Sequence, residues 1–317
     1  MVWKGVDFFP HNLRIPFTRY MWMFLMGSLV LNLLAIGIVA TRGLNFSIDF
    51  TGGTLMEITT KDGAADLAEL RSKLGNIGIG TPQIQAFGDG TGIMIRIQQQ
   101  EGGDKAQVEA VSKVKAVLGD GVEYRRTESA GPTVSGEIAR TGVIAVLVSM
   151  LGIAAYVWFR FEWQFAVGAT LSLIHDVLMT LGFFAVTGLE FDNNCIAALL
   201  TIVGYSINDS VVVYDRVREN LRKYKKMAIA ELLDRSINET LSRTVLTAGG
   251  VILALLALLS FGGEVIRSFI TAMLFGVITG TYSSIFVAST ALLMIGVKRD
   301  WSGTGGGAEA GTAVGRP

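Results

Sequence analysis

Residues 194–214 read NCIAALLTIVGYSINDSVVVY, and this stretch decides the class of fold. A helix of roughly 20 mainly apolar residues crosses the hydrocarbon core of a bilayer, which is about 30 Å thick. The stretch has this length and contains a single charged residue, Asp209. It therefore predicts a membrane-spanning helix. The composition agrees, since the chain is 50% hydrophobic and only 17% charged, against about 25% charged residues in soluble domains.

Further runs of the 317-residue chain are long and almost free of charge. They cover residues 20–40, 141–159, 165–186, 244–261 and 268–297. The first run is longer than the roughly 7–15 apolar residues of a secretory signal and lacks the small residue needed at a cleavage site, so we interpret it as a retained anchor. The sequence thus predicts a polytopic α-helical membrane protein with six transmembrane helices, the first over 20–40 and the others within 139–299.

Basic residues lie at those ends of the predicted spans that would share one side of the membrane. They precede the first span and follow the second, fourth and sixth spans. These residues are Lys4, Arg14, Arg19, Arg160, Arg216, Arg218, Arg222, Lys223, Lys225, Lys226, Arg235, Lys298 and Arg299. Because Lys and Arg accumulate on the cytoplasmic side, we expect a cytoplasmic N-terminus over 1–19, a basic cytoplasmic loop over 215–243 and a cytoplasmic C-terminus.

Residues 41–138 separate the first two spans and have the pattern of one extracytoplasmic domain. Strand-like runs cover 44–60, 83–87, 93–97 and 122–127, with Leu and Val at helical spacing between them. A Gly-rich loop between the middle two runs is a hairpin signal. The order βαββαβ predicts an α+β ferredoxin-like fold. The domain has neither His nor Cys, so we expect a recognition module without a catalytic site.

Charge balance and cysteine content argue against several function classes. Lys and Arg number 27, as do Asp and Glu, so the chain gives no reason to expect a nucleic acid partner. The single cysteine, Cys195, excludes an intrachain disulfide and a cysteine metal cluster. We expect no enzymatic activity, no metal site and no other cofactor. The Gly- and Ala-rich residues 300–317 predict a disordered C-terminal tail.

Few side chains within the predicted spans can carry charge. His175 and Asp176 lie in the third span and Asp209 in the fourth. A charged side chain at the centre of a span costs about 2.5–3.5 kcal/mol, so such residues mark candidate functional positions. Arg243 opens the fifth span at the side where Asp209 lies, so we predict that the two face each other. An opposite charge favours an ionised carboxylate and desolvation favours the neutral acid, so a change in their separation would couple to protonation.

Each of these positions also has a purely structural interpretation. Asp209 can be a static polar contact between helices, and Arg243 an ordinary basic residue at the cytoplasmic boundary. Residues that are candidates either for a proton relay or for interhelical polar contacts are His175, Asp176, Ser206 and Asn208.

Short motifs border the first, second and fourth spans. Residues 46–54 read FSIDFTGGT, residues 131–134 read GPTV, and residues 203–216 read VGYSINDSVVVYDR. With Arg243 and Thr244 at the start of the fifth span, these motifs resemble the SecF branch of the SecD/SecF family of protein-export membrane proteins, which is related to the RND superfamily.

The resemblance implies a subunit of a SecDF complex in the bacterial plasma (inner) membrane. Such a subunit assists Sec-dependent preprotein translocation, with the proton motive force as its energy source and no cofactor. By motif, Asp209 matches the proton-path carboxylate and Arg243 its basic partner, while Asp49, Gly52 and Gly53 match the motif after the first span. The implied partners are SecD, the SecYEG translocon with SecA acting on the same substrate, the translocating preprotein and membrane lipid.

Two other function classes stay open on the residues alone. An RND-type small-molecule efflux transporter would use the same six-span unit, usually in two copies with large outer domains. A non-conducting scaffold for a membrane partner would need Asp209 only as a packing contact. Because one six-span unit is half of a duplicated transporter, an obligate partner of similar topology is expected.

Overall fold

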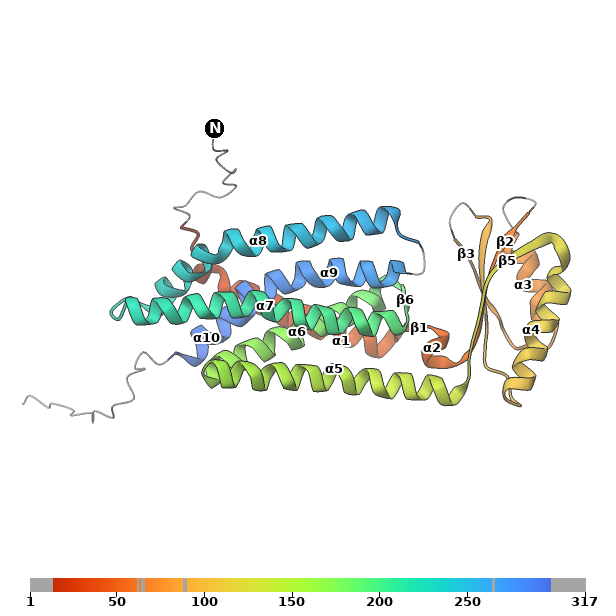
Figure 1. Ribbon diagram of the computed structural model, residues 1–317, viewed down its shortest axis with the longest axis horizontal. Helices are drawn as coiled ribbons and strands as arrows, with labels where there is room; N and C mark the ends of the chain where they lie inside the picture. The colour runs from red at the N-terminus through yellow and green to blue at the C-terminus, as the bar shows by residue number, and fades with distance from the viewer. Residues whose placement is uncertain (1–13, 62, 64–65, 88–89, 264–265, 298–317) are drawn as a thin grey trace, which may run out of the picture.

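The computed structural model describes residues 14–61, 63, 66–87, 90–263 and 266–297. The predicted tail over 300–317 and most of the predicted N-terminal segment over 1–19 lie outside these residues. Within them, six helices are long and apolar enough to cross a membrane, so the predicted polytopic helical membrane protein is confirmed. The helices run side by side, and a small α/β domain lies beyond one end of the bundle (Figure 1).

The first five spans are longer in the structure than the apolar runs that predict them, and the sixth is about as long as its run. A helix satisfies every backbone hydrogen bond within the segment, which a bilayer interior requires. The spanning helices are α1 (Phe17–Arg42), α5 (Pro132–Arg160), α6 (Trp163–Thr187), α7 (Asn193–Lys223), α8 (Ile229–Phe261) and α9 (Arg267–Ser283), the last of which continues through the π-helical turn η3 (Ser284–Ala288) into α10 (Ser289–Ile295). The predicted basic loop over 215–243 is largely helical, because α7 and α8 extend into it from both sides.

Three helices form the interior of the bundle. The apolar windows of α6, α7 and α9 are the most buried, whereas α1, α5 and α8 surround them. Two glycines let α9 lie close against α7: a Cβ at Gly276 would fall 2.3 Å from Ile202 Cδ1, and one at Gly280 would fall 3.1 Å from Ser206 Cβ. This close approach brings the polar residues of the two helices within hydrogen-bonding reach.

The extramembrane domain contains an antiparallel sheet of order β3-β4-β2-β5 within its described residues. Its elements are β2 (Gly53–Thr60), α3 (Leu67–Gly75), β3 (Gln83–Phe87), β4 (Gly92–Ile97), α4 (Asp104–Leu118), the 3₁₀ turn η1 (Gly119–Gly121) and β5 (Val122–Ala130). The order βαββαβ is the one that the sequence predicts. Helices α3 and α4 cover the face of the sheet turned away from the bundle, so the open face looks toward it (Figure 1).

The predicted strand over 44–60 is divided in the structure. Its first part is β1 (Asn45–Phe46), which pairs in parallel with β6 (Glu190–Phe191) between α6 and α7. A short helix, α2 (Ile48–Thr51), follows because the Ser47 hydroxyl accepts a hydrogen bond from the Asp49 N–H and caps it. The chain then turns at Gly52, which has a φ of 72°. The division ties the start of the domain to the end of the bundle.

Candidate functional site

A polar cluster surrounds Asp176 in the interior of the bundle. The side chain of Asp176 on α6 has 0% of its surface exposed. Its Oδ2 accepts hydrogen bonds from Ser206 Oγ on α7 at 2.5 Å and from Ser283 Oγ on α9 at 2.8 Å. Ser172 Oγ donates in turn to Ser283 Oγ at 2.9 Å. The cluster therefore joins the three interior helices.

Asp209 lies on α7 one turn after Ser206, and 2% of its surface is exposed. Its Oδ2 has no hydrogen-bond partner among the described residues, and the same is true of the hydroxyls of Tyr205 and Ser210 beside it. Buried polar atoms are normally paired, and leaving one unpaired costs about 1–3 kcal/mol. This segment of α7 therefore holds a buried carboxyl that hydrogen bonding does not stabilise.

Asp209 and Arg243 are not in contact. The Arg243 side chain on α8 is exposed, and no ion pair of 4.0 Å or less joins it to Asp209 in the described part of the chain. The structure thus shows no direct contact between the two residues that the sequence predicts to face each other.

The other candidate residues are divided between the interior and the surface. His175 is 2% exposed and faces α1, where its Nδ1 lies 2.8 Å from Asn32 Nδ2. Its Nε2 has no partner among the described residues, and its ring lies 6.0 Å from that of Tyr282. Asn208 is exposed on the outside of the bundle. The structure therefore brings Asp176 and Ser206 together, turns His175 toward another helix and leaves Asn208 outside the cluster.

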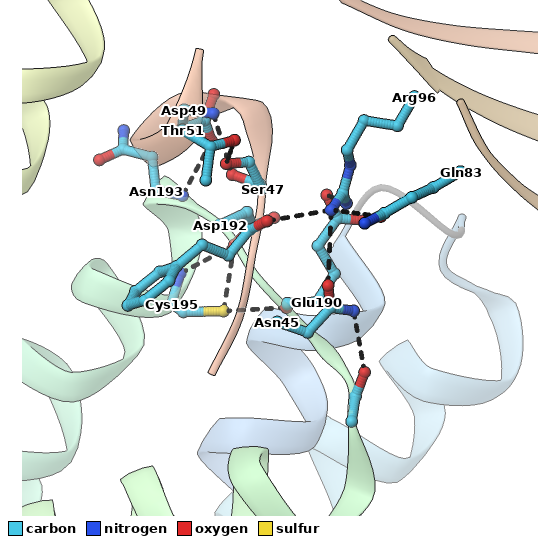
Figure 2. A network of polar contacts seen from close by, with 12 residues as sticks. Asn45, Ser47, Asp49, Thr51, Gln83, Arg96, Glu190, Asp192, Asn193 and Cys195 are labelled. Atoms are coloured by element: carbon cyan, nitrogen blue, oxygen red, sulfur yellow. Dashed lines mark hydrogen bonds and ion pairs between the residues drawn. The ribbon is translucent and has the colours of Figure 1, made fainter. Parts of the chain in front are cut away.

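Asp49 connects the extramembrane domain to α7. Its Oδ2 accepts a hydrogen bond from the backbone N–H of Asn193, the first residue of α7, at 3.0 Å. A carboxylate at this position is also stabilised by the dipole of the helix. Beside it, the Ser47 N–H donates to the Phe191 carbonyl oxygen at 2.9 Å. Figure 2 shows Ser47, Asp49 and Asn193 at the joint between domain and bundle.

The same joint contains an ion pair that no sequence motif predicts. Arg96 on β4 binds Glu190 on β6, and their side chains are only 13% and 23% exposed. Arg96 Nη1 also donates to the Phe46 carbonyl oxygen at 3.0 Å (Figure 2). Burial raises the pKa of Glu190, an effect to which Asp192 and Asp49 add and which Arg96 opposes. The sequence contains two signals for this pair. One is an arginine on the open face of a predicted strand, and the other is an acidic residue in the short turn between two spans.

Gly52 and Gly53 are placed where side chains do not fit. Gly53 has a φ of 115°, and a Cβ there would fall 2.3 Å from the Ile97 carbonyl oxygen in the neighbouring strand. Gly52 has a φ of 72°, and its Cβ would meet the Gln99 side chain at 2.5 Å. These glycines start β2 directly after α2, so they allow the tight connection between the joint and the sheet.

A cavity of about 700 Å³ separates the open face of the sheet from the end of the bundle. Glu57, Arg126 and Glu128 line it from the sheet, and Asn194 and Arg267 from the bundle. Within the described ranges, no group of three or more His, Cys, Asp or Glu could hold a metal ion. This cavity lies beside the joint, since Asn45, Ser47 and Asp49 also line it.

Two family models match the chain. The model described as "Protein export membrane protein SecD/SecF, C-terminal" covers residues 110–298, and the "SecD/SecF GG Motif" model covers residues 37–64. The chain belongs to the SecD/SecF family of protein-export membrane proteins. Residues 37–64 contain Asp49, Gly52 and Gly53, and residues 110–298 contain Asp176, Ser206 and Asp209.

Relatives within the SecD/SecF family match almost the whole chain. A protein translocase subunit SecF from Rickettsia felis is 42% identical over 92% of this chain and 94% of its own length. The SecF of Rhodobacter capsulatus is 44% identical over 92% of both chains. The SecDF of Brucella abortus is 40% identical over 91% of this chain and 38% of its own length.

A solved structure has the same fold. The crystal structure of SecDF from Thermus thermophilus, a translocon-associated membrane protein, superposes with a TM-score of 0.80 at 38% identity. The match covers 90% of this chain and 39% of the SecDF chain. At this identity and coverage, the chain is a multi-pass translocase subunit of the SecD/SecF family.

Proposed function

We propose that this chain is the SecF-like subunit of a SecDF complex that uses the proton motive force to assist Sec-dependent preprotein translocation. The observation that carries the proposal is Asp209, a buried carboxyl without a hydrogen-bond partner among the described residues, on a helix whose first residue binds the extramembrane domain. One helix thus has a site that can bind a proton and a connection to the part that would act on a substrate.

Arg243 gives Asp209 a way to sense the conformation of the bundle. When α7 and α8 approach each other at this level, the cation favours the ionised carboxylate, and when they separate, desolvation favours the neutral acid. Proton binding and release at Asp209 would therefore alternate with a relative movement of α7 and α8. In this proposal the proton gradient is the energy source, and the chain has no enzymatic activity and no cofactor.

The extramembrane domain is the part that we expect to engage preprotein. We interpret its βαββαβ order as the ferredoxin-like split βαβ unit. Basic residues at the opposite end of the bundle, such as Arg160, Arg216 and Arg222, favour the cytoplasm for that end. The domain would then face the outside of the bacterial plasma membrane, with both chain termini in the cytoplasm.

A stripe of small and polar residues on α7 supports an obligate membrane partner. Ala197, Thr201, Gly204 and Asn208 lie at helical spacing and are exposed. Small and polar residues are typical of helix interfaces within membranes, and lipid gives Asn208 no hydrogen-bond partner. We infer that SecD, with a similar set of spans, covers this stripe. SecYEG, SecA acting on the same substrate, the preprotein and surrounding lipid complete the proposed set of partners.

The replacement Asp209→Asn tests the proposal against a scaffold or an RND-type efflux unit. It should abolish the proton-dependent part of preprotein export and leave membrane insertion and SecD association unchanged. A pure scaffold would tolerate the replacement. An efflux unit would show altered accumulation of small molecules with normal export, so both alternatives give results that differ from the proposal.

A further inference from the structure

Asp176 is a buried acid, and no ion pair of 4.0 Å or less joins it to a basic side chain among the described residues. It has 0% of its surface exposed, and its Oδ1 has no hydrogen-bond partner among the described residues. The groups packed around it are the hydroxyls of Ser172, Ser206 and Ser283. An isolated charge in an apolar interior is so costly that a carboxyl there is paired, or neutralised by a proton.

In the part of the chain that the structure describes, the neighbouring helices supply no ion-pair partner to Asp176. Toward α1, His175 on the same helix binds Asn32, a neutral amide. On α5, Glu137 and Arg140 are exposed. On α7 the nearest acid is Asp209, and on α8 Arg243 is exposed. A proton is therefore the neutralising species that this arrangement accommodates.

We propose that Asp176 is a second proton-binding carboxyl of this chain, separate from Asp209. Binding of one proton converts the carboxylate, with its charge of −1, into a neutral acid whose O–H is a donor. This proposal deepens the proton coupling proposed above. Proton binding at Asp176 does not depend on the proposed function, but a role of that proton in transport does.

Ser283 gives this proton a structural consequence. Its Oγ has two acceptors in reach, Asp176 Oδ2 at 2.8 Å and the Gly280 carbonyl oxygen at 3.1 Å. A hydroxyl has one proton to donate, so it serves one acceptor at a time. With Asp176 ionised the hydroxyl donates to the carboxylate; with Asp176 protonated it donates to Gly280 and accepts from the acid. Proton binding thus reverses a hydrogen bond between α6 and α9.

The helix on the α9 side is locally adaptable at this place. The π-helical turn Ser284–Ala288 begins at the residue after Ser283. Such turns interrupt the regular bonding of a helix and occur frequently at functional sites. On the α7 side, Ser206 links Asp176 to the helix turn that holds Asp209. The two acids are therefore connected through α7, and a change at one alters the bonding near the other.

Infrared spectroscopy of the full chain in vesicles, recorded across a pH titration, tests the proposal. The probe is the proton itself, read from the C=O stretching band of protonated carboxyls. We expect Asp176→Asn to remove one buried-carboxyl band and Asp209→Asn to remove a different one. Ser206→Ala should shift the Asp176 band, since it removes one hydrogen bond to that carboxyl.

Ser210→Ala is the matched control. Ser210 is a buried serine on the same helix without a hydrogen-bond partner among the described residues, and its replacement should leave the Asp176 band in place. If Asp176→Asn does not fold, the test uses Ser206→Ala and Ser283→Ala in a chain with isotope-labelled aspartate. Each should shift the Asp176 carboxyl band. The proposal is overturned if Asp176→Asn leaves the spectrum unchanged at every pH. It is also overturned if both serine variants do so.

The outcome is independent of the proposed function of Asp209. Suppose that Asp209→Asn loses proton-dependent export and that Asp176→Asn leaves the infrared spectrum unchanged. The proposed function is then retained and the second proton site is rejected. Suppose instead that Asp176→Asn removes a carboxyl band and that Asp209→Asn exports normally. The second proton site is then retained and the proposed function is rejected.

Discussion

The Asp49 carboxylate in the extramembrane domain accepts a hydrogen bond from the backbone N–H of Asn193, the first residue of α7, at 3.0 Å. The same helix contains Asp209 and Ser206 deeper in the bundle. In the proposed function, a movement of α7 caused at Asp209 would reach the domain through this hydrogen bond to Asp49. The joint around Asp49 is therefore the mechanical link that proton coupling would need.

Arg96 should offset part of the cost of burying the Glu190 carboxylate at this joint. Arg96→Ala leaves a partly buried carboxylate without its cation and should weaken docking by about 1–3 kcal/mol. Adding Glu190→Gln should restore much of the loss, since it removes the unpaired charge. Hydrogen exchange of β1 and β6 measures the effect. As a control, Lys113→Ala removes an exposed pair with Glu109 and should change nothing there; equal effects of both replacements would contradict the assignment.

The stability of the joint should depend on pH through Glu190. Burial raises the pKa of this residue above its ordinary value of 4.5 in the folded protein, so the folded state binds the proton more tightly than the unfolded state. The stabilisation is complete below pH 4.5 and is lost as the pH rises through the folded-state pKa. Thermal unfolding of the full chain in detergent should therefore show a fall in stability over this range that Glu190→Gln reduces. An identical pH profile in the variant would refute it.

The two motif glycines should differ in their tolerance of alanine. Gly53→Ala drives a Cβ into the fixed carbonyl of Ile97, in addition to the backbone strain of about 1–3 kcal/mol at a positive φ. Gly52→Ala has the same kind of strain, but the Gln99 side chain that it meets can rotate away. Hydrogen exchange of β2 and β4 should show the larger loss of stability for Gly53→Ala. The reverse order would be inconsistent with this geometry.

A large side chain on the exposed stripe of α7 should disrupt the partner interface and leave the chain itself intact. A Cβ at Gly204 meets nothing within 4 Å in the chain, so Gly204→Leu should fold normally. Overpacking an interface costs about 1–3 kcal/mol, so we expect roughly tenfold less SecD to co-purify in mild detergent. Gly152→Leu on α5, also exposed and without neighbours within 4 Å, is the control. Full recovery of SecD with Gly204→Leu would show that the partner lies elsewhere.

The six spans could be predicted because length and lack of charge are local properties of the sequence. The βαββαβ order was readable for the same reason, from alternation and helical spacing. The short helix α2 was not, since Phe46 to Thr51 are strand-like in composition and the Ser47 cap decides the conformation. The helical extensions of α7 and α8 beyond the apolar runs were missed because the charged residues there were assigned to a loop.

The site could be predicted only in part. Asp176, Asp209 and His175 were recognisable as rare ionisable residues in apolar runs, but which neighbours they meet depends on helix packing. Ser206 and Asp176 form a hydrogen bond although they are 30 positions apart in the sequence, and Arg96 and Glu190 are 94 positions apart. No local pattern encodes such separations. The predicted facing of Asp209 and Arg243 stays a prediction, since no ion pair of 4.0 Å or less joins them among the described residues.

Preprotein translocation into vesicles, measured with and without an imposed proton gradient, tests the central claim most directly. The chain with Asp209→Asn should lose the gradient-dependent increase and keep the gradient-independent rate. Asp215→Asn, an exposed carboxylate on the same helix, should retain both. If Asp209→Asn retains the full gradient-dependent increase while assembled with its partner, Asp209 is not the proton-coupling residue and the account is wrong.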